Sequence, residues 1–472
     1  MASSFEASLP QPPNDPSVPF PYPIARPDPS AVPVPVKDLT PEQEAKLDKL
    51  VAHFNRPDWS PPNQLKVLKA QHTKETGGGS RFGGLFGRAT PLTSEEIADV
   101  RPLNDVEKCY WSKQAFLRCL RAVKWDYAAG VRRAEETLVW RREFKVEEMK
   151  ESDISREGET GKELVMGFDV NCRPVLYMHP NRQNTQVGPD QIAFVVWCLE
   201  RTLDLLPPTD PAVEMLCLCI DFGKDDKNAK SQPTTLGQAR KVLEILQTYY
   251  CERLGKAVCV NIPQIFFAFY KLVGPFVDPV TKDKIRFLDK PDATSLIPPS
   301  QLQTIFGGDV NMEYDHEKYF PALTKLCFER KAANLERWKK FGNGACGVDE
   351  AIIRGARVPG GVSESEEAGK GKAVAAQEAD VEGAQPAEEA VAESGVAPAP
   401  AYDPATAQEP PAEKLAAVSL ADENGGSSSG STAVVEEVAT PADEKFVDAP
   451  VASKEAVAEA VPAVQNGAVE AK

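Results

Sequence analysis

The chain has 472 residues, enough for two or three domains, and a formal net charge of −16. Beyond Arg357 it has 22 acidic and 6 basic residues, so this tail carries the whole net charge and the preceding part is balanced. A balanced folded part with an acidic tail excludes nucleic acid as an expected partner. No stretch reaches the ~18 apolar residues that span a bilayer. The cysteines are scattered, which predicts a reduced cytoplasmic setting.

The N-terminal part predicts a proline-rich segment, a helix, a linker and a helical module. Residues 1–38 are rich in proline and are expected to be extended and disordered. Within residues 39–90, Thr40-Pro-Glu-Gln43 has the sequence of a capping box that opens a helix, and a Gly-rich linker follows. Amphipathic patterns then predict two helices in a module of residues 91–148, at 106–123 and 127–144.

After residue 148, short β-prone runs alternate with helical patterns, which is typical of an α/β domain. Strands are predicted at 161–170, 173–180, 212–221 and 255–263, and helices at 189–206, 234–250 and 317–341. The run at 212–221 is apolar on consecutive residues, so both its faces should be covered, one by helices and the other by an apolar layer that a hydrophobic ligand could supply. Residues 342–472, rich in Ala, Glu and Pro, are predicted to be a disordered acidic tail.

The stretch from Tyr249 to Lys284 combines charged ends with an apolar centre. A carboxylate stands at Glu252 and an ammonium at Lys284, and the block 262–277 between them carries one charge, Lys271. A phosphorylated polyol headgroup needs an acceptor for its hydroxyls and a cation for its phosphodiester, while its acyl chains need an apolar wall. The pattern therefore fits a lipid. The alternative interpretation is a surface ion pair beside a buried helix.

Catalytic interpretations have less support. His179 ends a predicted strand without a nucleophile in a suitable context, as a solvated loop histidine would. Three carboxylates follow another strand with lysines interleaved, as in a solvated loop: Asp221, Asp225 and Asp226. We therefore expect no enzyme, no metal site and no cofactor. The alternative is a hydrolase or an oxidoreductase on an α/β scaffold.

Several motifs in one order resemble the fungal CRAL-TRIO phosphatidylinositol transfer proteins, the Sec-fourteen-like group. They are FLRCLRAVKWD at 116–126, RPVLYMHPNRQNT at 173–185, YYCERLGKAVCVNIP at 249–263, DPVTKDKI at 278–285 and the pair Gly307-Gly308. RQNT and NIP are most similar to the branch linked with pleiotropic drug resistance. The resemblance covers residues 105–341. It implies an N-terminal helical module and a lipid-binding domain at 149–341, in which a mixed sheet floors an apolar pocket under a helical gate.

The resemblance also implies roles for individual residues. Glu252 and Lys284, with Thr281, would contact the inositol phosphate headgroup. The helix at 263–276 would be the gate, and two glycines would be its hinges, Gly255 and Gly307. Four aromatic residues would face acyl chains or the bilayer when the gate opens: Phe266, Phe267, Phe269 and Phe276.

One position departs from the family's pattern. Many members have arginine at the fourth position of LRARK, where this chain has Val123, and valine cannot bind phosphate. Either Glu252 and Lys284 position the headgroup alone, or Arg121 has another role such as a salt bridge to the lipid-binding domain. We favour the second interpretation.

The predicted function is the binding of phosphatidylinositol and its exchange between membranes through a gated apolar pocket. Burying acyl chains at about 0.8 kcal/mol per methylene makes the bound state comparable to the bilayer, so a small movement of the gate can load or release lipid. The alternatives are a sterol or other neutral-lipid carrier and a scaffold that presents lipid to a phosphoinositide kinase. The expected partners are phosphatidylinositol, a second lipid, a lipid kinase and, transiently, the surface of a membrane or lipid droplet. The protein is expected to be a cytoplasmic monomer.

Overall fold

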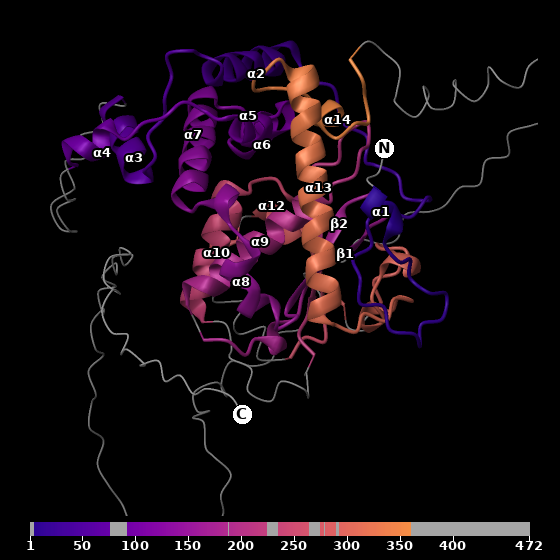
Figure 1. The fold of residues 1–472 in the computed structure, drawn as a ribbon. Coiled ribbons are helices and arrows are strands. Elements are labelled where there is room, and N and C mark those ends of the chain that lie inside the picture. Colours follow the sequence, from indigo (N-terminus) through magenta and orange to yellow (C-terminus); the bar gives the residue numbers. More distant parts are fainter. Residues whose placement is uncertain are drawn as a thin grey trace, which may run out of the picture. The chain divides into compact units, whose positions relative to one another are not determined.

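The computed structural model describes residues 4–75, 92–186, 188–223, 235–263, 274–277, 279–288 and 292–359, all within the unit Met1–Val381 (Figure 1). The α-helices are α1 (Ser4–Ser8), α2 (Pro41–Phe54), α3 (Leu65–Glu75), α4 (Ser94–Ala98), α5 (Asp105–Tyr110), α6 (Lys113–Ala122), α7 (Tyr127–Glu143), α8 (Glu151–Gly158), α9 (Pro189–Asp204), α10 (Leu236–Tyr249), α12 (Pro279–Lys284), α13 (His316–Gly342) and α14 (Glu350–Ile353). The strands are β1 (Glu163–Phe168), β2 (Pro174–Met178), β3 (Leu216–Asp221), β4 (Leu254–Val260) and β5 (Ile285–Phe287). Short 3-10 helices are η1 (Val146–Glu148), η2 (Pro180–Arg182), η4 (Gly274–Phe276), η5 (Pro299–Gln301) and η6 (Thr304–Phe306).

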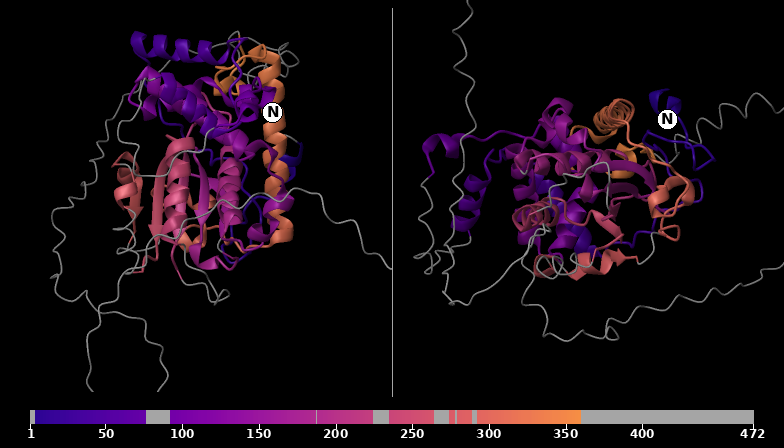
Figure 2. Two further views of the ribbon diagram at one scale, coloured as in Figure 1. Left: turned by 90° about the vertical axis from the view of Figure 1, so that its left-hand side faces the viewer. Right: turned by 90° about the horizontal axis from the view of Figure 1, so that it is seen from below.

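The strands form one mixed sheet in the order β1-β2-β3-β4-β5. β1 is antiparallel to β2, whereas β2, β3, β4 and β5 run parallel. Figure 2 shows the strands side by side, with α13 along one side of the sheet. The α/β class and the mixed sheet that the resemblance implied are therefore confirmed.

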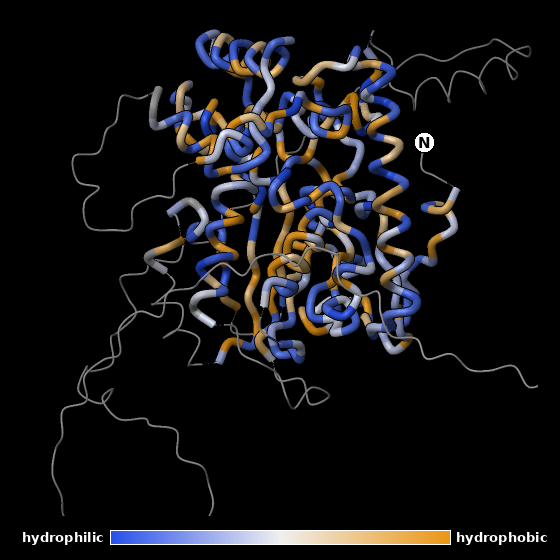
Figure 3. The backbone as a smooth tube through the Cα atoms, turned by 60° about the vertical axis from the view of Figure 1, so that its left-hand side comes forward, coloured by the Kyte–Doolittle hydropathy of each residue, from blue (hydrophilic) through white to orange (hydrophobic). Residues whose placement is uncertain are grey.

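Apolar residues cover both faces of this sheet. Leu218 packs in a cluster with residues of α9, whereas the ring of Tyr177 lies 5.4 Å from that of Phe306 on the opposite face. Cys217 and Cys219 are both buried on the face of Tyr177, as their spacing on a strand predicts. Hydrophobic segments accordingly run through the interior of the fold (Figure 3). This double coverage explains why β3 is apolar on consecutive residues.

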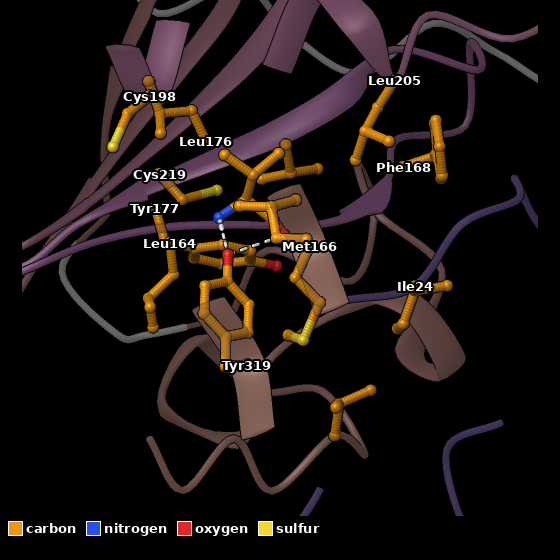
Figure 4. Close-up of a cluster of buried hydrophobic side chains, with 14 of the residues drawn as sticks. Ile24, Leu164, Met166, Phe168, Leu176, Tyr177, Cys198, Leu205, Cys219 and Tyr319 are labelled. Carbon is orange, nitrogen blue, oxygen red and sulfur yellow. Dashed lines mark hydrogen bonds between the residues drawn. The ribbon is translucent and has the colours of Figure 1, made fainter. Parts of the chain in front are cut away.

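A single buried hydroxyl joins α13 to the sheet. Tyr319 is 2% exposed, and its hydroxyl accepts a hydrogen bond from the N–H of Val165 at 2.5 Å and donates one to the carbonyl oxygen of Val165 at 3.0 Å (Figure 4). Val165 lies on β1, the first strand in the sheet order. The backbone groups of an outer strand need such partners when they are buried. Tyr319 therefore satisfies the outward backbone groups of β1 at Val165.

Tyr319→Phe is expected to lower the free energy of unfolding by about 1–3 kcal/mol, because two buried backbone groups would lose their partner. Urea denaturation of the full chain measures this loss. Tyr127→Phe is the matched control, since the hydroxyl of Tyr127 makes an exposed bond of 3.5 Å to the carbonyl of Lys49. The control should lose less than about 0.5 kcal/mol. Equal losses in the two variants would contradict the role given to Tyr319.

The predicted disorder of residues 1–38 is wrong for residues 4–38. Phe20 and Ile24 are 3% and 4% exposed and belong to the main hydrophobic cluster. Glu6 binds Arg330 of α13, with 3.1 Å between Oε2 and Nε. Proline excludes regular strands in this segment, but the apolar side chains between the prolines still pack against the core.

Most predicted helices are found, with one break. α2 begins after Thr40 with the complete capping box. The helix expected over 106–123 is divided into α5 and α6, because Ser112 opens a new helix by accepting a hydrogen bond from the N–H of Ala115 at 3.1 Å. The helices expected at 189–206, 234–250 and 317–341 correspond to α9, α10 and α13. The elements additional to the prediction are α1, α3, α4, α8, α12, α14 and β5.

The folded part also extends beyond the predicted start of the tail at residue 342. Asn343 caps α13 with a φ of +50°, and Gly344 and Gly347 follow with φ values of +71° and +90°, so the chain turns back after the helix. Cys346 is buried, and Oε1 of Glu350 in α14 accepts hydrogen bonds from Ser112 at 2.8 Å and Arg118 at 3.2 Å. Residues 360–472, where the rest of the predicted tail falls, lie outside the described residues.

Candidate functional site

Aromatic packing at the end of α10 fixes the turn that holds Glu252. Tyr249 stacks on Trp140 of α7 with ring centroids 4.3 Å apart, and the hydroxyl of Tyr250 donates to Oε1 of Glu200 at 2.6 Å. Glu252 has a φ of +59°, which is uncommon for a residue with a Cβ. The chain then enters β4 at Leu254. The turn therefore presents Glu252 at the amino end of β4.

Lys284 comes to the same end of the sheet from the neighbouring strand. It ends α12, which packs against β4 and leads into β5. Ala257 of β4 pairs with Ile285 of β5. Lys284 lies one residue before this pair on its chain segment, and Glu252 lies five residues before it on the other. A difference of four residues is at most about 13 Å along a strand. Thr281 lies one helical turn before Lys284, on the same face of α12.

The charged groups of Glu252 and Lys284 are available to a ligand. Both side chains are only partly exposed. Within the residues that the structure describes, neither side chain forms a hydrogen bond or an ion pair. Glu214, a partly buried carboxylate that lies before β3 at this end of the sheet, is by contrast paired with Arg121. An acceptor and a cation without protein partners at one end of two adjacent strands can therefore bind a polar, anionic group from outside the protein.

Two glycines predicted as hinges have packing roles of their own. A Cβ on Gly255 would lie 2.7 Å from Cδ of Arg173, so the stem of this arginine fills the space beside β4. Gly307 has a φ of +91° and ends η6, where its N–H donates to the carbonyl of Thr304 at 3.0 Å. These contacts explain why glycine is present at both positions. Their action as hinges stays a prediction.

One of the four predicted gate aromatics lies in the described part of the chain. Phe276, in η4, is 45% exposed and lies under the guanidinium of Arg240, 4.3 Å from the ring centroid. The carbonyl oxygen of Phe276 accepts a hydrogen bond from Nε2 of Gln247 at 2.7 Å. Both partners are on α10, so this end of the predicted gate is attached to that helix. Phe266, Phe267 and Phe269 lie outside the described residues.

Arg121 forms the salt bridge that we favoured from the sequence. Its Nη2 donates to Oε2 of Glu214 at 2.8 Å, and Nη1 of Arg118 donates to the same oxygen at 2.8 Å. Both arginines are on α6, whereas Glu214 lies two residues before β3. The interpretation that Arg121 links the helical module to the lipid-binding domain is confirmed. Val123 ends α6 as its C-cap residue.

Sequence reasoning missed the buried ion pairs behind the turn. Arg141 of α7 donates to both carboxylate oxygens of Glu200 on α9, at 2.8 and 3.0 Å. Burial raises the pKa of Glu200, but the attraction and hydrogen bonds of Arg141 outweigh it, and the pKa falls to about 2. The sequence contained a signal that Arg141 is buried, because Arg141 lies on the same helical face as the fully buried Ala134 and Leu138. These pairs hold the helical module against the domain that carries Glu252.

The stability that Glu200 contributes is expected to be lost in acid. Since its folded pKa of about 2 lies below the ordinary value of 4.5, this contribution is complete above about pH 4.5 and declines as the pH falls toward 2. Urea unfolding at about pH 6 and about pH 3 should give a smaller pH difference for Glu200→Gln than for the wild type. Glu244→Gln, a change at an exposed site of α10, is the control and should keep the wild-type difference. Equal pH differences in all three proteins would contradict the assignment.

His179 and Asp221 are buried, whereas the sequence suggested solvated loop residues. Nδ1 of His179 lies 3.5 Å from Oδ2 of Asp221, whose Oδ1 accepts from the side-chain amide of Asn261 at 2.8 Å. Burial raises the pKa of Asp221, but hydrogen bonds from His179 and Asn261 bring the pKa below its ordinary value. This cluster links the carboxyl ends of β2, β3 and β4. Asp225 and Asp226 lie outside the described residues.

The described ranges contain neither a metal-binding cluster nor a membrane-spanning helix. In these ranges, no group of three or more His, Cys, Asp or Glu side chains is arranged to hold a metal ion. No helix within the same ranges has the length and apolar character needed to cross a bilayer.

Comparison with known proteins shows what the chain is similar to. The family model of the CRAL/TRIO domain matches residues 158–308, which include Glu252, Thr281 and Lys284. A CRAL-TRIO domain-containing protein of Schizosaccharomyces pombe is 43% identical over 253 residues, or 54% of this chain and only 24% of that protein. The phosphatidylinositol transfer protein PDR17 of Saccharomyces cerevisiae is 36% identical over 267 residues, or 55% of this chain and 75% of PDR17. The SEC14 cytosolic factor of Eremothecium gossypii is 31% identical over 253 residues, or 48% of this chain and 80% of that protein.

Proposed function

This chain belongs to the CRAL/TRIO domain family, and we propose that it binds phosphatidylinositol and exchanges it between membranes without covalent chemistry. One relative is named a phosphatidylinositol transfer protein, and the match covers 75% of it. The observation that carries the proposal is the pair Glu252 and Lys284. These opposite charges lie at the same end of β4 and β5 and have no partner within the described residues.

The headgroup would be held by complementary chemistry at this end of the sheet. The carboxylate of Glu252 accepts hydrogen bonds from inositol hydroxyls, and the ammonium of Lys284 binds the phosphodiester. The hydroxyl of Thr281, on the same face of α12 as Lys284, adds a donor to the phosphate oxygens. Sterol has one hydroxyl and no charge, so it would leave both charged groups unsatisfied. The pair therefore favours an anionic, hydroxyl-rich headgroup over a neutral lipid.

The acyl chains would occupy an apolar pocket that the helix at 263–276 opens and closes. Its aromatic residues would enter the membrane interface when the helix swings out about Gly255 and Gly307: Phe266, Phe267, Phe269 and Phe276. The exposed ring of Phe276 supports this orientation at one end of the segment. Contact with membranes or lipid droplets would then be peripheral and transient, from the cytoplasm.

Exchange of this kind needs no cofactor and no second subunit. The ligand is phosphatidylinositol, and a second lipid would occupy the same pocket in alternation. Such a monomer could also present its lipid to a phosphoinositide kinase, since presentation requires only the same partial opening of the gate.

Lipid identification tests the proposal. Mass spectrometry of lipid extracted from the purified full chain should find phosphatidylinositol, and the protein should move phosphatidylinositol between two vesicle populations. Extraction and transfer of sterol alone would replace the proposal by a neutral-lipid carrier. The absence of both bound lipid and transfer would overturn it.

A further inference from the structure

A separate cavity of about 350 Å³ lies where α5, α7, α9, α13 and α14 meet. At about 30 Å³ for each molecule of liquid water, this volume equals that of about twelve water molecules. One part of its wall is apolar: Val106, Leu203, Leu206, Phe328, Leu335 and Ile353. Phe328 is 40% exposed, so the cavity reaches the surface beside α13. A cavity with this wall has room for a compact organic molecule.

The rest of the wall is charged, and its carboxylates are all paired within the described residues. The pairs are Glu147 with Arg141 and Lys331, Glu200 with Arg141, Asp204 with Arg201, and Glu350 with Arg118 and Arg354. None of these carboxylates is available to bind a cation. The wall therefore offers no site for a metal ion or an amine.

Arg253 differs from the other basic residues of the wall. It is 8% exposed, and its Nη1 donates to the backbone carbonyl of Glu214 at 2.7 Å, but it forms no ion pair with any carboxylate in the described ranges. Burial and the repulsion of Arg118 lower the pKa of Arg253 to about 10. A buried guanidinium without a carboxylate partner is costly unless an anion compensates it.

We propose that this cavity binds an amphipathic anion, a phosphate or carboxylate on a compact apolar group, with Arg253 as the residue that binds the anionic end. The guanidinium supplies donors in a planar fork that matches phosphate and carboxylate oxygens. The apolar wall covers the remainder of the molecule. The inference does not depend on lipid transfer, since the cavity and the pair of Glu252 and Lys284 are built from different side chains.

Phenyl phosphate is a suitable probe, and its binding to the full chain can be followed by phosphorus NMR and calorimetry. Arg253→Met should weaken binding by about tenfold or more, because a hydrogen-bonded charge contact is lost. Arg121→Met is the matched control: it removes a guanidinium from the same junction, but Arg121 does not line the cavity. The control should bind as the wild type does. Equal affinity in all three proteins would overturn the proposal.

A second variant keeps the test decisive if Arg253→Met fails to fold. Ala332 lines the cavity from the exposed side of α13, so Ala332→Trp should fill the cavity without disturbing a buried contact. Binding of phenyl phosphate should then fall by a similar factor. Unchanged binding in this variant would place the probe elsewhere and overturn the proposal.

Further probes measure the contributions of the anionic and the apolar part of the ligand separately. They also test whether the anion belongs to a separate molecule or to phosphatidylinositol. Inorganic phosphate and benzyl alcohol should each bind at least about tenfold more weakly than phenyl phosphate, since each lacks one half of the recognised chemistry. Inorganic phosphate that binds as tightly as phenyl phosphate would contradict the role of the apolar wall. Protein loaded with phosphatidylinositol should bind the probe as well as unloaded protein does. Loss of binding on loading would instead identify the anion as the lipid's own phosphate and refute a separate ligand.

Discussion

Alanine at both Glu252 and Lys284 is expected to abolish phosphatidylinositol transfer while the free energy of unfolding changes by less than about 0.5 kcal/mol. Neither side chain has a hydrogen-bond or ion-pair partner among the residues described, so their removal leaves no protein group unsatisfied. A headgroup that lost both contacts would lose several kcal/mol of binding free energy, at about 1.5–3 kcal/mol for each charge-assisted hydrogen bond. Transfer between labelled vesicles and urea denaturation measure the two quantities.

The matched control for this variant lies on α10. Lys241 and Glu244 form an exposed ion pair of 3.4 Å on that helix, so replacing both by alanine makes the same chemical change on the same domain. This control should transfer phosphatidylinositol at the wild-type rate. Undiminished transfer by the variant at Glu252 and Lys284 would refute the headgroup site. A loss of folding stability in that variant would show that the two residues are structural.

The elements that could be predicted from the sequence are those with a local pattern. β1 to β4 are apolar runs between turn residues, and α2 has a capping box, so each is visible within about ten residues. β5 could not be predicted, because it has three residues and exists only through its pairing with β4. The burial of Phe20 and Ile24 could not be predicted for a related reason. Their burial is a property of the surface that they meet and not of the proline-rich segment that contains them.

Some residues of the candidate site could likewise be predicted from the sequence, and others could not. Glu252 and Lys284 could be selected because they flank an apolar block in a short span and match the motifs of a family. The groups that hold this site could not be selected. Arg118 and Glu350 are separated by 232 residues, and Arg141 and Glu200 by 59. A charged residue gives no local sign of which distant charge it will meet, so only the fold shows that these residues belong together.

The ion pair between Arg118 and Glu350 joins residues that are far apart in the sequence and buried in the fold. Arg118→Met should lower the free energy of unfolding by about 3 kcal/mol or more, because the buried carboxylate of Glu350 and the partly buried carboxylate of Glu214 would lose a partner at once. Arg118 is 4% exposed and contacts Glu214 at 2.8 Å and Glu350 at 3.2 Å. The attraction of these carboxylates outweighs burial and raises the pKa of Arg118, which therefore stays charged. Urea denaturation of the full chain measures the loss.

Arg121→Met isolates the contribution of burial in this prediction. The side chain of Arg121 is 29% exposed and binds the same oxygen of Glu214 at the same distance of 2.8 Å, but it has no contact with Glu350. A partly solvated ion pair contributes at most about 1 kcal/mol, so this variant should be much less destabilised than Arg118→Met. Equal losses would mean that Glu214 alone matters and that α14 is not held by Arg118. A much larger loss for Arg118→Met would show that the buried contact with Glu350 of α14 contributes to the stability of the fold.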